Sequence, residues 1–139
     1  MARCLFCSET GGTLLWTSQL CRVVLADEPD QPGLCRVVLT GHVAEMTDLL
    51  HADAAEVMRI VFATERAVRD ALRPDKVNLA SLGNLIPHLH WHVIPRWEDD
   101  RHFPRPIWAE PLRPATVRPV PADLADYLTR DLAAALGDG

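Results

Sequence analysis

The sequence lacks any apolar run that approaches the roughly 20 residues of a membrane-spanning helix. Its N-terminal residues, MARCLFCSE, contain no apolar segment followed by a small-residue cleavage site, as a secretory signal would require. Cysteine is also sparse, with four in 139 residues. Four cysteines in a chain without an export signal indicate reduced thiols rather than a disulfide framework. We therefore expect a cytoplasmic protein that does not enter a membrane.

An excess of positive charge is missing too, because 14 basic residues face 19 acidic ones and the net charge is −5. A nucleic-acid polymer is bound through a basic footprint, so we expect no such partner. A small anionic ligand is still allowed where positive charge is local to a site. The length predicts one domain over residues 1–139, in which residues 98–139 form a loop and a C-terminal helix as an extension.

Histidine, in contrast, is concentrated: three of the six lie at His88, His90 and His92. They alternate with Leu89, Trp91 and Val93. A β-strand sends successive side chains to opposite faces, so a strand here would place three imidazoles on one face, about 6.6 Å apart, with the apolar residues on the other. Packing alone gives no reason for this pattern.

Two chemistries suit such a row of imidazoles. Imidazole is the commonest metal ligand in proteins, so the three could form a three-histidine metal site. They could equally act on a phosphate, since a neutral imidazole held by a hydrogen bond at its far nitrogen is a good nucleophile.

The run His88-Leu89-His90-Trp91-His92-Val93-Ile94 resembles the motif of the histidine-triad (HIT) family, in which histidines alternate with apolar residues. The resemblance covers roughly residues 4–97. It implies an α+β fold, with a mainly antiparallel sheet of about five strands, a long helix on one face and a C-terminal helix. It also implies a homodimer and a nucleotide hydrolase or transferase that acts at an α-phosphate. Diadenosine polyphosphates, nucleoside phosphoramidates and related adenylates all fit as substrates.

The same resemblance implies roles for single residues. His90 would attack the α-phosphorus and form a nucleotidyl-histidine, His92 would donate to the phosphate or the leaving group, and His88 would orient His90 or bind zinc. Nucleotide contacts are implied at four further positions, namely Asp27 for the ribose and Asn78, Gly83 and Asn84 for the phosphate. Taken alone, Asp27 and Asn84 are equally typical of turns, and Gly83 permits close backbone approach.

Cys4 and Cys7 form a C-x-x-C pair, which by itself is compatible with half of a zinc site, a redox pair or two buried thiols. The HIT resemblance implies the first, with His42 and His88 as the other two ligands. Two cysteines and two histidines would give closed tetrahedral coordination and a structural zinc.

The rest of the chain predicts the framework around this strand. Two runs of identical sequence, 21–25 and 35–39, predict a hairpin. A helix is expected from a capping box of Asp53 and Glu56 to Arg73-Pro74, with an apolar stripe along it. Residues 76–82 predict another strand, 98–121 a loop, and 121–136 a helix with Pro121 in its first turn.

Two rival functions stay open at this point. One is a metal-dependent hydrolase that uses the triad as ligands, and the other is a nucleotide-binding regulatory protein with vestigial activity.

Overall fold

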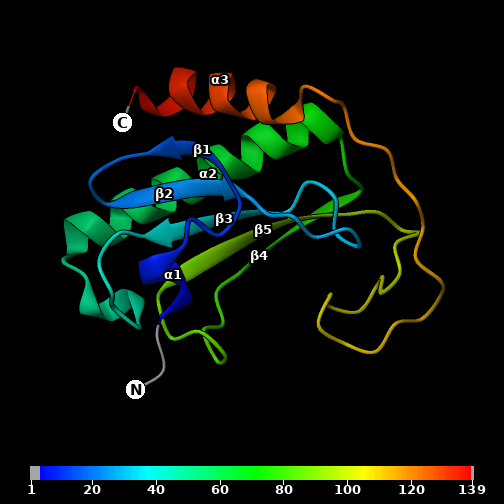
Figure 1. Cartoon of the computed structure of the whole chain (residues 1–139), viewed down its shortest axis with the longest axis horizontal. Helices are drawn as coiled ribbons and strands as arrows, with labels where there is room; N and C mark the ends of the chain where they lie inside the picture. The colour runs from blue at the N-terminus through cyan, green and yellow to red at the C-terminus, as the bar shows by residue number, and fades with distance from the viewer. Residues whose placement is uncertain (1–3, 139) are drawn as a thin grey trace.

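The computed structural model describes residues 4–138, and residues 1–3 and 139 lie outside the described part. Five antiparallel strands form one sheet in the order β1-β2-β3-β5-β4 (Figure 1). The strands are β1 (Thr13–Thr17), β2 (Cys21–Leu25), β3 (Cys35–Leu39), β4 (Lys76–Ala80) and β5 (His90–Arg96). The helices are α1 (Leu5–Ser8), the 3₁₀ turn η1 (Met46–Asp48), α2 (His51–Leu72) and α3 (Leu124–Leu136). The predicted α+β class with a five-stranded antiparallel sheet is confirmed.

The predicted hairpin of the two repeated runs is β2–β3, in which Cys21 pairs with Leu39 and Leu25 with Cys35. The strand predicted over 76–82 ends at Ala80. The histidine strand begins at His90, so His88 lies before it rather than on it. Strand β1 and helix α1 were not predicted, because both are short and carry little periodicity.

Helix α2 buries the expected stripe, including Val57, Ile60, Val61 and Val68. The capping-box prediction is wrong, because the helix begins at His51 after Leu50 and no side chain caps it. The burial of the apolar stripe, which begins at Val57, therefore stabilises the helix without a polar cap.

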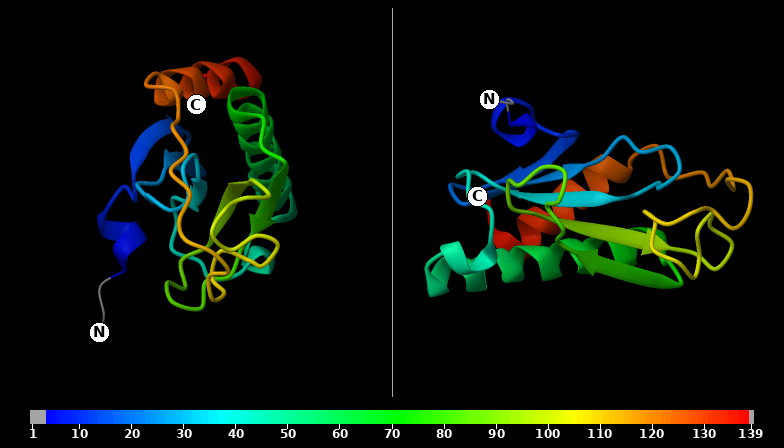
Figure 2. Two further views of the ribbon diagram at one scale, coloured as in Figure 1. Left: turned by 90° about the vertical axis from the view of Figure 1, so that its right-hand side faces the viewer. Right: turned by 90° about the horizontal axis from the view of Figure 1, so that it is seen from below.

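The helices α2 and α3 cover one face of the sheet, and α1 lies on the other (Figure 2). The main core lies between the sheet and the two long helices, where Val23, Val37 and Val93 are fully buried. Helix α3 begins at Leu124, three residues later than predicted, so Pro121 precedes it and only its carbonyl accepts the Leu124 N–H. Between β5 and α3 the chain forms neither helix nor strand, as expected.

No helix in residues 4–138 combines the length and apolar character that a membrane crossing requires. Because side chains alternate along a strand, the residues of β3 and β5 that face away from α2 form a second surface. That surface carries Arg36, His90 and His92, and α1 lies above part of it.

Candidate active site

The three histidines are all buried, with 0%, 6% and 8% of the surface of His88, His90 and His92 exposed. His90 and His92 occupy the first and third positions of β5 and face away from α2. Leu89 and Val93 belong to the core on the opposite face, as the alternation predicted. Buried polar groups need hydrogen-bond partners, so those of the imidazoles define what each ring is free to do.

Both ring nitrogens of His88 have partners other than His90. Its Nε2 lies 2.7 Å from the carbonyl oxygen of Leu39. Because a carbonyl only accepts, Nε2 carries the proton and donates. The other nitrogen, Nδ1, faces Cys4, Cys7 and His42. The side chain of His88 is thus committed elsewhere, and only its main chain reaches His90.

The His88 carbonyl oxygen lies 2.7 Å from Nδ1 of His90. By the same reasoning Nδ1 of His90 donates, and the lone pair of this imidazole is on Nε2. Burial lowers the pKa of His90, opposed by the His88 hydrogen bond and assisted by the charges of Arg36 and His88. His90 is therefore a neutral imidazole with a defined tautomer, which is the form that attacks phosphorus.

His92 is held differently, since its buried Nδ1 has no hydrogen-bond partner within residues 4–138. Burial, followed by the neighbouring charges of His90 and Arg36, lowers the pKa of His92 to about 4. The ring packs edge to face against His90 and Trp108, with centroid separations of 4.9 and 5.1 Å. An unpartnered buried nitrogen beside His90 is free to bind a ligand.

A cleft of about 570 Å³, here named the triad cleft, opens over His90 and His92. Most of its wall is apolar, and Phe6 packs against His90 with 4.7 Å between ring centroids. The apolar side chains come from α1, the loop before β5 and the loop after it: Leu5, Phe6, Leu82, Leu85, Ile86 and Trp108. A mostly apolar cleft with a few polar groups is typical of a small-molecule site.

The structure brings two of the four predicted nucleotide contacts into this cleft. Gly83 and Asn84 line it, and Gly83 has a φ of +73°, a conformation that favours glycine. Asp27 and Asn78 lie outside its wall. Asp27 is exposed beyond the end of β2, and the side-chain oxygen of Asn78 accepts a hydrogen bond from buried Arg96 at 2.8 Å.

Arg36 was not predicted. It is the direct partner of His92 in the β3–β5 ladder, lines the triad cleft and pairs with Glu28 at 3.3 Å. Arg22, at the same place in the first repeated run, instead donates to the carbonyls of Phe6, Glu9 and Thr10 and so holds α1 over the sheet. Strand alternation could have placed Arg36 on one face, but only the strand order brings it to His92.

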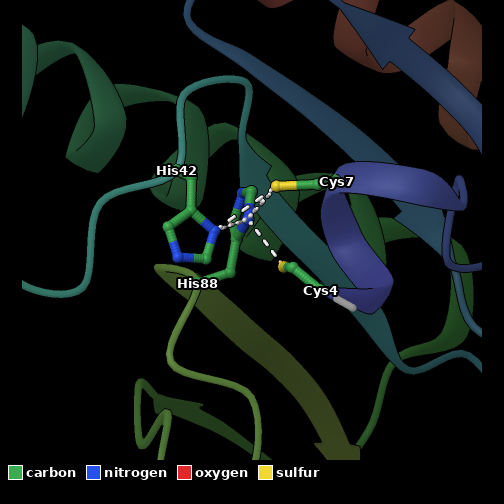
Figure 3. Close-up of side chains that lie close together, drawn as sticks. All are labelled: Cys4, Cys7, His42 and His88. Atoms are coloured by element: carbon green, nitrogen blue, oxygen red, sulfur yellow. Dashed lines mark hydrogen bonds between the residues drawn. The ribbon is translucent and has the colours of Figure 1, made fainter. Parts of the chain in front are cut away.

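Cys4, Cys7, His42 and His88 come together as the sequence analysis expected (Figure 3). Their ligand atoms all lie within 4.8 Å of one another. The Cys4 Sγ–His88 Nδ1, Cys7 Sγ–His42 Nδ1 and His42 Nδ1–His88 Nδ1 distances are 3.3, 3.3 and 3.2 Å. Ligands about 2.0–2.3 Å from a tetrahedral zinc lie about 3.3–3.8 Å apart, so these residues could hold one metal ion.

The HIT domain family model matches residues 8–99, which is more than half of the chain. Over 102 residues the chain is 32% identical to an AP-4-A phosphorylase of Mycobacterium tuberculosis, covering 69% of this chain and 52% of that protein. The chain thus spans about half the length of that relative.

Solved structures of other proteins have a fold similar to that of this chain. A histidine triad protein from Bradyrhizobium japonicum matches with a TM-score of 0.71 and 25% identity over 91% of this chain and 92% of that one. One from Marinobacter aquaeolei matches with a TM-score of 0.69 and 25% identity over 91% and 90%. With the histidine strand, its oriented His90 and the matched domain, this chain belongs to the HIT family of nucleotide-processing proteins.

Proposed function

We propose that this protein cleaves adenosine derivatives at the α-phosphate through a nucleotide bound covalently to His90. The observation that carries the proposal is the 2.7 Å hydrogen bond from Nδ1 of His90 to the His88 carbonyl, which leaves Nε2 as the nucleophilic nitrogen. In the first step Nε2 forms a bond to the α-phosphorus while the bond to the leaving group breaks. In the second step water or another acceptor takes the nucleotide and frees His90.

Phosphoryl transfer places charge on the peripheral oxygens, so donors around the phosphorus matter more than acid–base chemistry. The N–H of His92, the guanidinium of Arg36 and the Asn84 amide all face the triad cleft and would supply such donors. The apolar wall formed by Phe6 and its neighbours would take the adenine. Asp27 and Asn78 remain family-implied contacts with no geometric support at this cleft.

The rival metal-dependent mechanism is less well supported. Within residues 4–138, His88 lies close to other metal-binding side chains, those of Cys4, Cys7 and His42. Neither His90 nor His92 belongs to that group. The remaining rival, a regulatory protein with vestigial activity, does not explain why His90 is held neutral with its lone pair toward the cleft.

The adduct is the direct test. An adenylated substrate, quenched at alkaline pH because phosphoramidates are acid-labile, should leave a nucleotide-sized mass increment on the peptide that contains His90. His90→Ala should lose the adduct and nearly all turnover while it still binds nucleotide. His92→Ala should form the adduct more slowly, by roughly 10²–10⁴. Full activity in His90→Ala would exclude this proposal.

A structural zinc is the second part of the proposal, at Cys4, Cys7, His42 and His88. The donor set suits zinc, which prefers thiolate and imidazole ligands in closed tetrahedral sites. The Leu39 carbonyl would fix the ring of His88 from behind, as carbonyl partners of metal-bound histidines generally do. The ion would connect α1 to the loop before the catalytic strand, and its role would be stability rather than chemistry.

We also propose a homodimer, as the HIT resemblance implies. Strand β4 is an edge of the sheet, so its outer backbone groups are open to pairing with another chain. Light scattering at micromolar concentration tests this proposal, and a monomeric mass would exclude it.

A further inference from the structure

Helix α1 supplies the part of the triad cleft wall that lies against His90. Its residues Leu5 and Phe6 both line the cleft. Phe6 is buried, with 7% of its surface exposed, and 4.7 Å separate the centroids of its ring and the His90 ring. A Cβ at Gly11 would come within 3.0 Å of the same phenyl ring, so the chain closes tightly around it. A small movement of α1 would therefore change the shape of the cleft.

Helix α1 depends on the rest of the protein for its position. It has only four residues, and no side chain within residues 4–138 caps its start. Helices this short are unstable unless other parts of the chain hold them. The last carbonyls of a helix also lack donors within the helix. Contacts from outside α1 must therefore fix where Phe6 lies.

The side chain of Arg22, on β2, provides such contacts. Its Nη2 donates to the carbonyls of Phe6 and Glu9, both at 2.8 Å, and its Nε donates to the carbonyl of Thr10 at 2.9 Å. A guanidinium is planar and its donors point in fixed directions, so three bonds to one segment define the orientation of that segment. Arg22 does not itself line the triad cleft, and any effect on a ligand there passes through α1.

Packing alone does not explain an arginine at this position. Arg22 is half-buried and forms no ion pair within the described residues, whereas Arg36, its counterpart in the second repeated run, pairs with Glu28. Partial burial of a guanidinium costs desolvation free energy. Val24, two positions later and so on the same face of the sheet, fills its space under the 4–12 segment as a fully buried apolar residue. What the arginine adds is three directed hydrogen bonds.

We propose that Arg22 is a positioning residue for nucleoside binding, which acts through α1 by holding Phe6 against the base. This role rests on the proposed function, in which the apolar wall around Phe6 takes the adenine. The base is bound equally in the ground state and in the transition state, so a displaced wall raises KM and leaves kcat nearly unchanged. The hydrogen bond that orients His90 is made to the His88 carbonyl and does not involve α1.

The test measures AMP binding by calorimetry and the turnover of the p-nitrophenyl ester of AMP. Arg22→Gln removes the charged anchor of α1 and should weaken AMP binding and raise KM by roughly 10-fold, with kcat within about twofold of wild type. Arg22→Lys keeps the charge and should recover part of the affinity. Arg59→Gln, which changes an exposed arginine of α2 on the other face of the sheet, should alter none of these values.

A double-mutant cycle tests whether Arg22 acts through Phe6. Phe6→Leu removes the aromatic ring but keeps an apolar side chain, and it should weaken AMP binding by roughly fivefold in the wild-type background. In the Arg22→Gln background, where the ring is already displaced, the same change should cost less than about twofold. Equal costs in both backgrounds would overturn the proposal, because Arg22 would then act independently of Phe6. If Arg22→Gln does not fold, Arg22→Lys takes its place in the cycle under the same criteria.

Two further results would overturn the role of Arg22. One is AMP binding that is as tight in Arg22→Gln as in wild type. The other is a lower kcat with an unchanged KM, because a variant that only loses folded protein loses active sites and not affinity.

A failure of the proposed function is distinguishable from a failure of this role. If wild type forms no adduct and turns over no ester, but its AMP binding follows the cycle as expected, the function is wrong and the role of Arg22 stands. If wild type turns over the ester and Arg22→Gln matches it in KM, the role fails and the function stands. The absence of AMP binding in wild type would overturn both.

Discussion

Arg36 and His92 lie directly opposite each other on β3 and β5. Burial lowers the pKa of His92 to about 4, and the charges of His90 and then of Arg36 contribute to the shift because each disfavours a second positive charge nearby. His92 is consequently neutral at physiological pH, although it belongs to the residue type that titrates there most readily.

Arg36→Gln should therefore raise the pKa of His92 above 4, but not to its ordinary value near 6.5, because burial, the main cause of the shift, remains. The imidazole resonances followed by NMR through pH 3.5–7.5 measure this change. Arg105→Gln removes the same charge from an exposed site and should leave the titration unaltered. Identical His92 curves in both variants would contradict the role given to Arg36.

The lowered pKa of His92 also makes the stability of the folded protein depend on pH. The folded-state pKa of His92 lies below its unfolded value, so its contribution is fully present above about pH 6.5 and is lost as pH falls toward 4. His92→Gln should make the decline in Tm between pH 6.5 and 4.5 shallower than in wild type. A decline as steep as that of wild type would assign the acid sensitivity to other groups.

Metal content tests the cluster at the N-terminal segment. Wild-type protein should carry about one zinc per chain, and Cys4→Ser/Cys7→Ser should carry none. Cys35→Ala is the control, since burial raises the pKa of that thiol to about 12 and it faces the core. A chelator should lower the Tm of wild type and of the control but not of the double variant. Equal zinc in the wild type and the double variant, or none in the wild type, would exclude the site.

Arg96 is 2% exposed, and it donates to both carboxylate oxygens of Asp100, at 2.7 and 3.1 Å, and to the carbonyl of Arg105. Arg96→Met leaves that carboxylate without its buried partner and should cost about 3–5 kcal/mol of the free energy of unfolding. Arg59→Met breaks the exposed pair with Glu56 and should cost about 0–1 kcal/mol. Urea denaturation of both variants measures the difference, and similar losses would contradict it.

The helices and strands that could be predicted are those whose sequence pattern lies within the element itself. Alternation predicts the faces of β5, a 3.6-residue stripe predicts α2, and the repeated runs predict the β2–β3 hairpin. The Cys/His cluster was predicted from the family resemblance, and its two histidines lie 46 residues apart in the sequence. Boundaries were less accurate, since α2 begins without the polar cap that its sequence suggests.

The relationships that could not be predicted depend on partners distant in sequence. Arg22 and Arg36 occupy the same place in identical pentapeptides, yet one anchors α1 and the other faces His92, because different strands flank them. Asn78 is polar in an apolar strand and needed a partner, but nothing local points to Arg96. Much of the wall of the triad cleft comes from loops, whose paths no periodicity describes.

The attachment of the loop between β5 and α3 bears on how new substrate specificities could arise in this fold. The loop is anchored through Arg96, at the last position of β5, whereas His90 stands at the first, about 20 Å away along the strand. Insertions, deletions or exchanges in the loop therefore alter the wall of the triad cleft, to which the loop contributes Trp108, without disturbing the hydrogen bond that orients His90. Selection can act on the choice of substrate and on the chemistry as separate traits, and loop grafting offers the same independence to protein engineering.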